Sequence, residues 1–286
     1  MKNLFLSFSI LLFFVAVSFS QTKNSCCDET NCETTTAPNK MASFSNDENF
    51  RNAHPEPLAF KLTDGKGKMI TFKINDGKDA NGYEIKADNP TNKWIFVFHE
   101  WYGLNDYVKK ESEELATKLG VNVLAVDLYD GKIALNNEEA SKYVKEVDNT
   151  RAINIIYGSR DYAGTDAVFG TIGWCFGGAW SNHTAIELGD KCKACVIYYG
   201  MPESNTERLA KLKAPVLGIF AKQDGWITPE VAAKFEENLK SLNISVDIKI
   251  YDAVHGFANP SNPKHDVDAT KDAKEKTVKF LSEKMK

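Results

Sequence analysis

The sequence predicts one α/β domain with a mostly parallel central sheet and helices on both of its faces. Two observations carry this prediction. Short continuous apolar runs, typical of strands buried on both faces, alternate with longer segments of helical spacing. The chain has 286 residues, of which 43% are hydrophobic, and this is enough for one sizeable core. We find no internal repeat and no second domain.

The elements follow from the pattern in chain order. Segments 69–74 and 82–86 alternate in polarity and are separated by Asp-Gly turns, which predicts an antiparallel edge of the sheet. Apolar runs then predict buried strands over 93–98, 121–129, 168–172, 194–199, 216–221 and 246–251. Helical spacing predicts helices over 106–119, 138–162, 178–186, 203–212, 229–242 and 266–285. We expect the second of these helices to break near Asp148 and Asn149, and the alternation to give a parallel sheet.

Residues 1–20 have the features of a secretory signal peptide. A positive start at Lys2 precedes an uncharged apolar stretch, and Ser18 and Ser20 supply small residues before Gln21. We therefore expect cleavage after Ser20 and a periplasmic or secreted protein, without stable membrane insertion, because the stretch is short for a span. Residues 21–57 are polar and without apolar period, which predicts a flexible leader before a domain over 58–286.

The charge pattern argues against a nucleic-acid partner. The formal net charge is −4, and the lysines are scattered rather than clustered. The oligomeric state is not predicted by the sequence.

The chain has six cysteines, and export would allow disulfides. Cys26, Cys27 and Cys32 favour a local disulfide or an unstructured tail over a metal site, because no histidine precedes His54. Cys192 and Cys195 form a Cys-x-x-Cys pair, and thiol redox work is one alternative function for the chain. A redox pair usually opens a helix, whereas this pair leads into a predicted strand. A disulfide or two unpaired thiols is therefore favoured there.

The pentapeptide from Gly173 to Gly177 carries the main chemical signal. It joins a predicted strand to a predicted helix, and its spacing is that of a nucleophile elbow with Cys175 in place of serine. Glycines two before and two after the nucleophile avoid steric clashes in this tight turn. The positive end of the following helix should favour the thiolate. The alternative interpretation is a buried inert cysteine.

Two further loops supply partners for this thiol. Asp224 follows strand 216–221, and His255 follows strand 246–251. Taken alone, Asp224 could be a turn residue and His255 an ordinary loop histidine. Since the carboxyl ends of parallel strands share one edge, however, both side chains should lie near Cys175. A thiol nucleophile needs a base and a group that orients the base, and the order Cys175, Asp224, His255 is that of an α/β-hydrolase.

The loop after strand 93–98 provides further candidates. The backbone N–H groups of Trp101 and Phe176 would stabilise an oxyanion, and Glu100 would lie near the thiol unless it is a solvated loop acid. For His99 a structural role is favoured. Aromatic residues of these loops are candidates for a substrate pocket, although each could be core: Tyr102, Trp174, Trp226 and Phe257.

The chain resembles the dienelactone hydrolase family over roughly residues 60–280. The resemblance is sharpest at His99-Glu-Trp-Tyr-Gly103, Asp127-Leu-Tyr-Asp-Gly131, Gly173-Trp-Cys-Phe-Gly-Gly178 and His255-Gly-Phe-Ala-Asn-Pro260. It implies an α/β-hydrolase fold, with Cys175 as nucleophile, His255 as base and Asp224 as orienting residue. It also implies that Glu100 interacts with the resting thiol and helps to activate it.

One substrate-binding feature of the family is missing. Its founding members hold a substrate carboxylate with arginines, and Asn259 stands at one of these positions, while residues 130–147 contain lysines but no arginine. We therefore expect Asn259 to contact the substrate, but the pattern argues against an anionic dienelactone.

The resulting expectation is an exported hydrolase of a small-molecule ester or lactone, acting through an acyl-thioenzyme without metal or organic cofactor. A catalytically silent binding module with the same fold is the other alternative.

Overall fold

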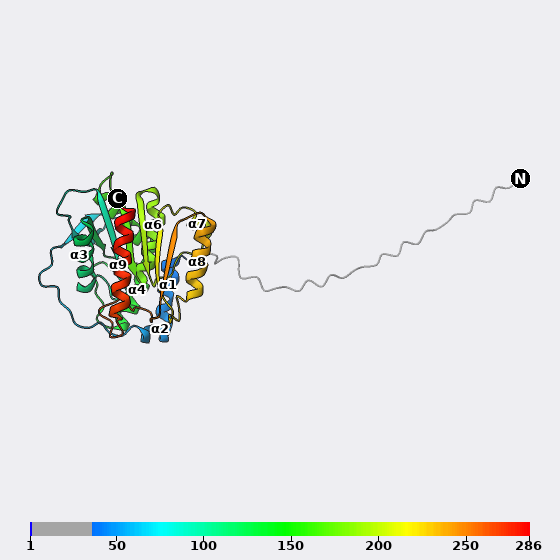
Figure 1. Cartoon of the computed structure of the whole chain (residues 1–286), viewed down its shortest axis with the longest axis horizontal. Helices are drawn as coiled ribbons and strands as arrows, with labels where there is room; N and C mark the ends of the chain where they lie inside the picture. The colour runs from blue at the N-terminus through cyan, green and yellow to red at the C-terminus, as the bar shows by residue number, and fades with distance from the viewer. Residues whose placement is uncertain (2–35) are drawn as a thin grey trace. The chain divides into compact units, whose positions relative to one another are not determined.

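The computed structural model describes residue 1 and residues 36–286, and the described residues form one eight-stranded sheet flanked by helices (Figure 1). The strands are β1 (Lys68–Lys73), β2 (Asp79–Ile85), β3 (Lys93–Phe98), β4 (Asn122–Val126), β5 (Val168–Trp174), β6 (Cys192–Tyr198), β7 (Val216–Ala221) and β8 (Val246–Tyr251).

The sheet has the order β1-β2-β4-β3-β5-β6-β7-β8. Strands β1, β2 and β4 pair antiparallel, and all pairs from β4 to β8 are parallel. The predicted antiparallel edge and the predicted parallel sheet are both confirmed. Because β5 lies inside the sheet, the carboxyl ends of β5, β7 and β8 bring their loops to one edge.

The long helices cover both faces of the sheet. Their bounds are α3 (Asp106–Leu119), α4 (Asn137–Glu146), α5 (Asn149–Ala163), α6 (Phe176–Leu188), α8 (Pro229–Ser241) and α9 (Val267–Lys284). Thr171 of β5 hydrogen-bonds to Ser181 of α6, whereas a side chain at the neighbouring Gly170 would meet Leu281 of α9. Helices α6 and α9 therefore lie on opposite faces, and α3 packs beside α9.

The helix predicted over 138–162 is broken as expected. Helix α4 ends at Glu146, and the carboxylate of Asp148 accepts a hydrogen bond from the backbone N–H of Arg151 at 2.7 Å. Asp148 is thus the N-cap of α5.

Two predicted elements are shorter than expected. The helix predicted over 203–212 is the single turn α7 (Thr206–Leu209), because Asn205 caps it and the backbone N–H of Glu203 bonds to Asn182 instead. The strand predicted over 121–129 ends at Val126, since the carboxylate of Asp127 accepts the N–H groups of Tyr129 and Gly131 and curls the chain.

The flexible leader predicted over 21–57 is wrong for residues 36–57. These residues form α1 (Ala37–Ser43), the 3-10 turn η1 (Phe44–Asn46) and α2 (Glu48–Ala53), with Met41 and Phe50 buried. Helix α1 packs against α6. The segment is ordered by apolar contacts with the domain rather than by an apolar period of its own. The predicted signal peptide and Cys26, Cys27 and Cys32 lie outside the described residues.

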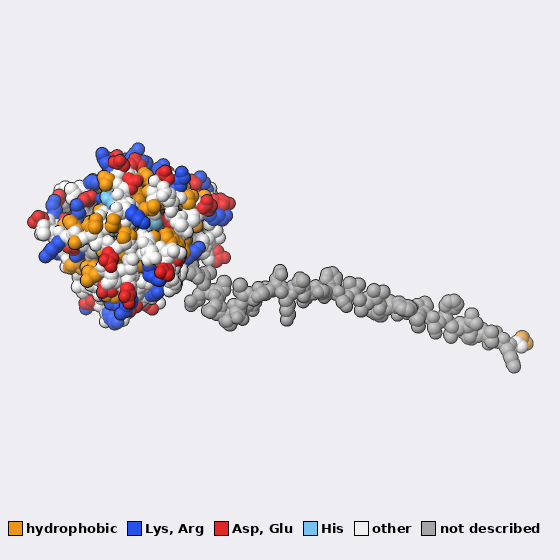
Figure 2. All heavy atoms as spheres, turned by 90° about the horizontal axis from the view of Figure 1, so that it is seen from below, with side chains coloured by type: hydrophobic (Ala, Val, Ile, Leu, Met, Phe, Trp, Pro, Cys, Tyr) orange, Lys and Arg blue, Asp and Glu red, His pale blue; other side chains and the backbone are white. Residues whose placement is uncertain are grey.

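Two surface features bear on the predicted partners. In the face shown in Figure 2, basic and acidic side chains are interspersed rather than gathered into a patch of one sign. Among the described helices, none has the length and apolar character needed to cross a membrane.

Candidate active site

Cys175 occupies a strained position between β5 and α6. Its backbone has φ +53° and ψ −117°, a conformation rarely adopted by a residue with a side chain. A Cβ at Gly173 would lie 2.0 Å from the carbonyl oxygen of Gly177, and one at Gly177 would lie 2.2 Å from that of Phe98. Both glycines are therefore required by close backbone approach, as the spacing of the pentapeptide predicts.

Asp224 and His255 form a buried pair at the same edge of the sheet. The Nδ1–H of His255 donates to Oδ2 of Asp224 at 2.6 Å, while Oδ1 accepts the backbone N–H groups of Trp226 and Ile227 at 2.9 and 3.0 Å. These contacts fix the orientation of the carboxylate and hold the proton of the imidazole on Nδ1. The other ring nitrogen, Nε2, is buried and has no hydrogen-bond partner among the described residues.

The charges of the three groups are coupled. Burial opposes ionisation of Asp224, but the charge of His255 and the hydrogen bonds from His255, Ile227 and Trp226 together outweigh burial and hold the pKa of Asp224 below its ordinary value. Burial likewise opposes protonation of His255, but Asp224 and then Cys175 raise its pKa well above the ordinary value. Burial raises the pKa of the Cys175 thiol and outweighs His255, which lowers it. The positive end of α6 was expected to favour the thiolate of Cys175, but with the thiol buried as it is in this structure the thiolate is not favoured.

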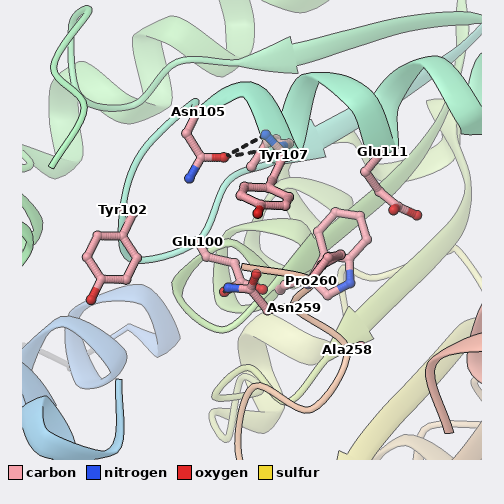
Figure 3. A pocket seen from close by; sticks show the side chains of 10 residues that line it. Glu100, Tyr102, Asn105, Tyr107, Glu111, Ala258, Asn259 and Pro260 are labelled. Carbon is pink, nitrogen blue, oxygen red and sulfur yellow. Dashed lines mark hydrogen bonds between the residues drawn. The ribbon is translucent and has the colours of Figure 1, made fainter. Parts of the chain in front are cut away.

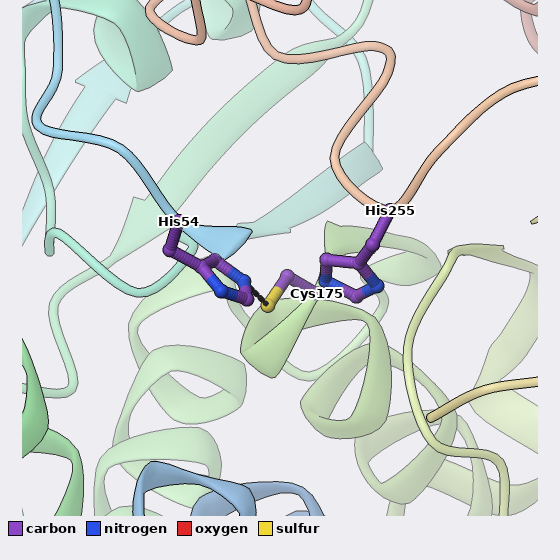
Figure 4. Close-up of side chains that lie close together, drawn as sticks. All are labelled: His54, Cys175 and His255. Atoms are coloured by element: carbon purple, nitrogen blue, oxygen red, sulfur yellow. Dashed lines mark hydrogen bonds between the residues drawn. The ribbon is translucent and has the colours of Figure 1, made fainter. Parts of the chain in front are cut away.

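A second histidine, which the sequence did not single out, lies against the thiol (Figure 4). Nε2 of His54 is 3.6 Å from Sγ of Cys175, and its Nδ1–H donates to the carbonyl oxygen of Phe50 at 2.6 Å. Burial and then the charge of His255 lower the pKa of His54 to about 3, so the ring is neutral and its Nε2 accepts the S–H of Cys175.

Phe50 of α2 packs on the ring of His54 and covers the site. Its ring packs against those of Trp101, Trp226 and His255, at centroid distances of 5.5, 5.1 and 5.8 Å. The N-terminal segment (residues 36–57) is also held in place by the indole N–H of Trp226, which donates to Asp47 at 2.9 Å. Cys175 is consequently only 1% exposed. The i, i+4 spacing of Phe50 and His54 was the only signal in the sequence that could have pointed to this contact.

Glu100 is near enough to Cys175 for its charge to raise the pKa of the thiol, and its carboxylate is held by two donors. The hydroxyl of Tyr199 donates to Oε1 at 3.1 Å, and Nδ2 of Asn259 donates to Oε2 at 2.7 Å. Burial raises the pKa of Glu100 to about 7, and these hydrogen bonds reduce the shift only in part. Glu100 can therefore hold or release a proton near neutral pH.

Replacing this carboxyl is expected to change how stability depends on pH. Because the pKa of Glu100 rises from 4.5 to about 7 on folding, the folded chain keeps a proton that the unfolded chain loses, and stability falls as pH rises through this window. Glu100→Gln removes this loss, so the variant should gain up to about 3 kcal/mol relative to the parent between pH 4.5 and 7.5. Urea unfolding at several pH values measures the difference. Glu237→Gln, at an exposed position of α8, is the control, and a pH-independent difference for Glu100→Gln would contradict this account.

Neither of the two expected oxyanion donors bonds to a backbone carbonyl of the described residues. Phe176 is the first residue of α6, so its N–H has no intrahelical partner. The N–H of Trp101 makes no hydrogen bond to the described residues. The N–H of Phe176 is directed at the sulfur of Cys175 and favours its thiolate.

The five candidate substrate residues fall into two groups. Tyr102, Trp174 and Asn259 line a pocket beside Glu100, together with Tyr107 and Pro260 (Figure 3). Trp226 packs instead on Phe50, and Phe257 is fully buried against Tyr199 and Tyr251. Cys175 does not line this pocket.

The contacts of His99, Cys192 and Cys195 indicate structural rather than catalytic roles. The rings of His99 and Tyr129 pack together, and Nε2 of His99 accepts the backbone N–H of Leu128 at 3.2 Å. Cys192 and Cys195 are free and buried on β6, and burial raises the pKa of Cys195 to about 11. This environment suppresses the thiolate that redox exchange needs.

Comparison with known proteins agrees with this geometry. The model of the dienelactone hydrolase family matches residues 80–285. The chain belongs to the dienelactone hydrolase family. It is therefore a member of a hydrolase family, and the match includes the loops that carry Glu100, Cys175, Asp224 and His255.

Individual relatives extend over most of the chain. Protein usf of Aquifex pyrophilus is 27% identical over 233 residues, covering 76% of this chain and 98% of its own. Carboxymethylenebutenolidase of Pseudomonas sp. (strain P51) is 28% identical over 201 residues, covering 65% and 83%. A crystal structure described as a putative dienelactone hydrolase from Klebsiella pneumoniae superposes with a TM-score of 0.64 at 20% identity, covering 76% and 98%. The predicted α/β-hydrolase fold is confirmed.

Proposed function

We propose that this chain is exported and hydrolyses a neutral carboxylic ester or lactone through Cys175, His255 and Asp224. The single observation that carries the proposal is the oriented imidazole. Asp224 fixes the Nδ1–H of His255, and the free Nε2 and the sulfur of Cys175 lie in one cluster within 4.8 Å. Export rests on the signal-peptide pattern of residues 1–20.

The chemistry follows from these three groups. His255 takes the proton of the Cys175 thiol on Nε2, and the sulfur attacks the ester carbonyl carbon. The tetrahedral intermediate collapses to a thioester on Cys175, and the alcohol leaves with the proton from His255. His255 then takes a proton from water, the resulting hydroxide attacks the thioester, and the acid leaves as the sulfur regains its proton.

The surrounding groups support each step. The N–H groups of Phe176 and Trp101 would stabilise the negative oxygen of both intermediates. Asp224 stabilises the imidazolium that forms on His255. Glu100, with its pKa near 7, would receive or return a proton as the buried thiol ionises, in agreement with the role implied by the family.

The pocket beside Glu100 favours a neutral substrate. Its lining includes the carboxyl groups of Glu100 and Glu111 but no lysine, arginine or histidine. Asn259, which stands where the family has an arginine, already donates its amide to Glu100. A substrate carboxylate would be desolvated there beside Glu100, and the lining has no cationic side chain to balance its charge.

Esters of different charge test this proposal. The full chain should hydrolyse p-nitrophenyl acetate and butyrate, and it should hydrolyse the mono-p-nitrophenyl ester of succinic acid at least about tenfold more slowly in kcat/KM, because one unfavourable charge contact costs more than 1 kcal/mol. Lack of hydrolysis of all neutral esters by the reduced, folded chain would contradict the function. Preference for the anionic ester would contradict the substrate class.

Substrate access requires the segment over Cys175 to open, and Phe50 should control this opening. Phe50→Ala removes a ring that is 1% exposed and weakens the packing of α2 on the site by about 3 kcal/mol or more. Alkylation of Cys175 by iodoacetamide, followed by peptide mass spectrometry, should then become at least about tenfold faster. Phe60→Ala, at a 38% exposed position outside this segment, is the control. Equal alkylation rates in the parent and Phe50→Ala would show that the segment does not limit access.

A further inference from the structure

We propose that His54, Cys175 and His255 form a binding site for a zinc ion, which joins the N-terminal segment to the catalytic loops. Each residue offers one ligand atom, and these atoms lie within 4.8 Å of one another (Figure 4). They come from three separate parts of the chain: the end of α2, the start of α6 and the loop after β8. The proposed ester hydrolysis uses only two of the three.

The donor set and its spacing suit zinc. One thiolate and two imidazoles are typical zinc ligands, and three protein ligands leave the fourth tetrahedral position to water. Bond lengths of about 2.3 Å to sulfur and about 2.05 Å to nitrogen at a tetrahedral angle put the two ligand atoms about 3.6 Å apart. The distance between Sγ of Cys175 and Nε2 of His54 is 3.6 Å.

Both imidazoles are already oriented as metal ligands. A ligating histidine almost always donates its second ring N–H to a carboxylate or a backbone carbonyl. His255 donates its Nδ1–H to Asp224 and His54 donates its Nδ1–H to the carbonyl of Phe50, each at 2.6 Å. Both Nε2 atoms therefore face the same volume, where each offers a lone pair once it carries no proton, and Nε2 of His255 is buried without a hydrogen-bond partner in the described part of the chain.

Zinc binding would have two consequences. The thiol of Cys175 loses its proton to solvent as the zinc–sulfur bond forms, and the ion uses the same sulfur and Nε2 lone pairs that ester hydrolysis needs. Bound zinc would therefore inhibit the hydrolase, a consequence that rests on the proposed function. Because His54 belongs to the N-terminal segment, the ion would also hold that segment closed over Cys175.

The binding test needs no catalytic activity. The test uses the reduced full chain with Cys26→Ser, Cys27→Ser and Cys32→Ser, so that thiols outside the described residues do not bind metal. Cobalt(II) would report a thiolate-to-metal absorption band, and calorimetry would measure zinc binding. We expect one zinc ion per chain, loss of the band in Cys175→Ala, and at least about tenfold weaker zinc binding in His54→Gln. His265→Gln, outside the cluster, should bind zinc like the parent.

Each outcome bears on the proposal separately from the hydrolase activity. Zinc binding of unchanged affinity in folded His54→Gln, or a cobalt complex without a thiolate band, would overturn the site. Equal weakening in His265→Gln would indicate adventitious histidine binding and would overturn it too. If the parent hydrolyses p-nitrophenyl acetate, zinc should inhibit it reversibly, and the inhibition constant should rise at least about tenfold in His54→Gln. If no ester is hydrolysed, the proposed function fails, while the absorption and calorimetric results still decide the site.

Discussion

Cys175→Ala is expected to lower kcat for p-nitrophenyl acetate by about 10⁴-fold or more, because no other group can form the covalent intermediate. The substitution removes one buried sulfur at the end of β5 and leaves the contacts of Gly173 and Gly177 in place. The fold should therefore survive, and a circular dichroism spectrum like that of the parent would confirm it. Steady-state kinetics of the purified chain measure the loss.

Cys192→Ser provides the matched control for this experiment. Cys192 is also a buried, free thiol, but it is the first residue of β6, and its sulfur is directed at the carbonyl of Ala194. Cys192→Ser should leave kcat within about twofold of the parental value, since Cys192 contacts none of the reacting groups. If Cys175→Ala kept more than about a tenth of the parental activity, a thioester on Cys175 could not be the main route.

Asp224→Asn should cost about 10³ to 10⁴-fold in kcat, the size of loss seen when the acid of a serine triad is changed to its amide. The amide can still accept the backbone N–H groups of Trp226 and Ile227. It would present an N–H to Nδ1 of His255, however, and drive the ring proton to Nε2, where it blocks transfer from the thiol. The variant should also lose the charge that raises the pKa of His255, so the acidic limb of the pH–rate profile, where the base becomes protonated, should move to lower pH.

Asp252→Asn is the control for this prediction. Asp252 begins the same loop as His255, but its side chain is 73% exposed and pairs only with Lys222 and Gln223 among the described residues. Its replacement should leave both kcat and the pH profile unchanged. Folded Asp224→Asn with activity within a few-fold of the parent would show that His255 does not depend on this carboxylate.

The catalytic loops could be predicted from the sequence because they follow strands with strong patterns. Strands β5, β7 and β8 are continuous apolar runs or clear alternations, and parallel pairing places their carboxyl ends together. The contact of Asp224 with His255 follows from that geometry. The elbow glycines could be predicted as well, since the clash of a Cβ depends only on local backbone.

The N-terminal segment that covers Cys175 (residues 36–57) could not be predicted in this way. Helices α1 and α2 have seven and six residues, which is too short to show a period or to be stable alone. Their burial depends on Trp101, Trp226 and other residues that are distant in sequence. His54 therefore appeared only as an isolated histidine in a polar stretch. The raised pKa of the Cys175 thiol could not be predicted for the same reason. Burial under this segment raises the pKa by more than the positive end of α6 lowers it.

The most direct test of the central claim is the mass of the intact chain quenched in acid during turnover of p-nitrophenyl butyrate. The account predicts one butyryl group, located by peptide mapping on Cys175, absent from Cys175→Ala and removed by neutral hydroxylamine as a thioester should be. Hydrolysis that proceeds with no acyl group on Cys175, or with the group on another residue, would contradict it.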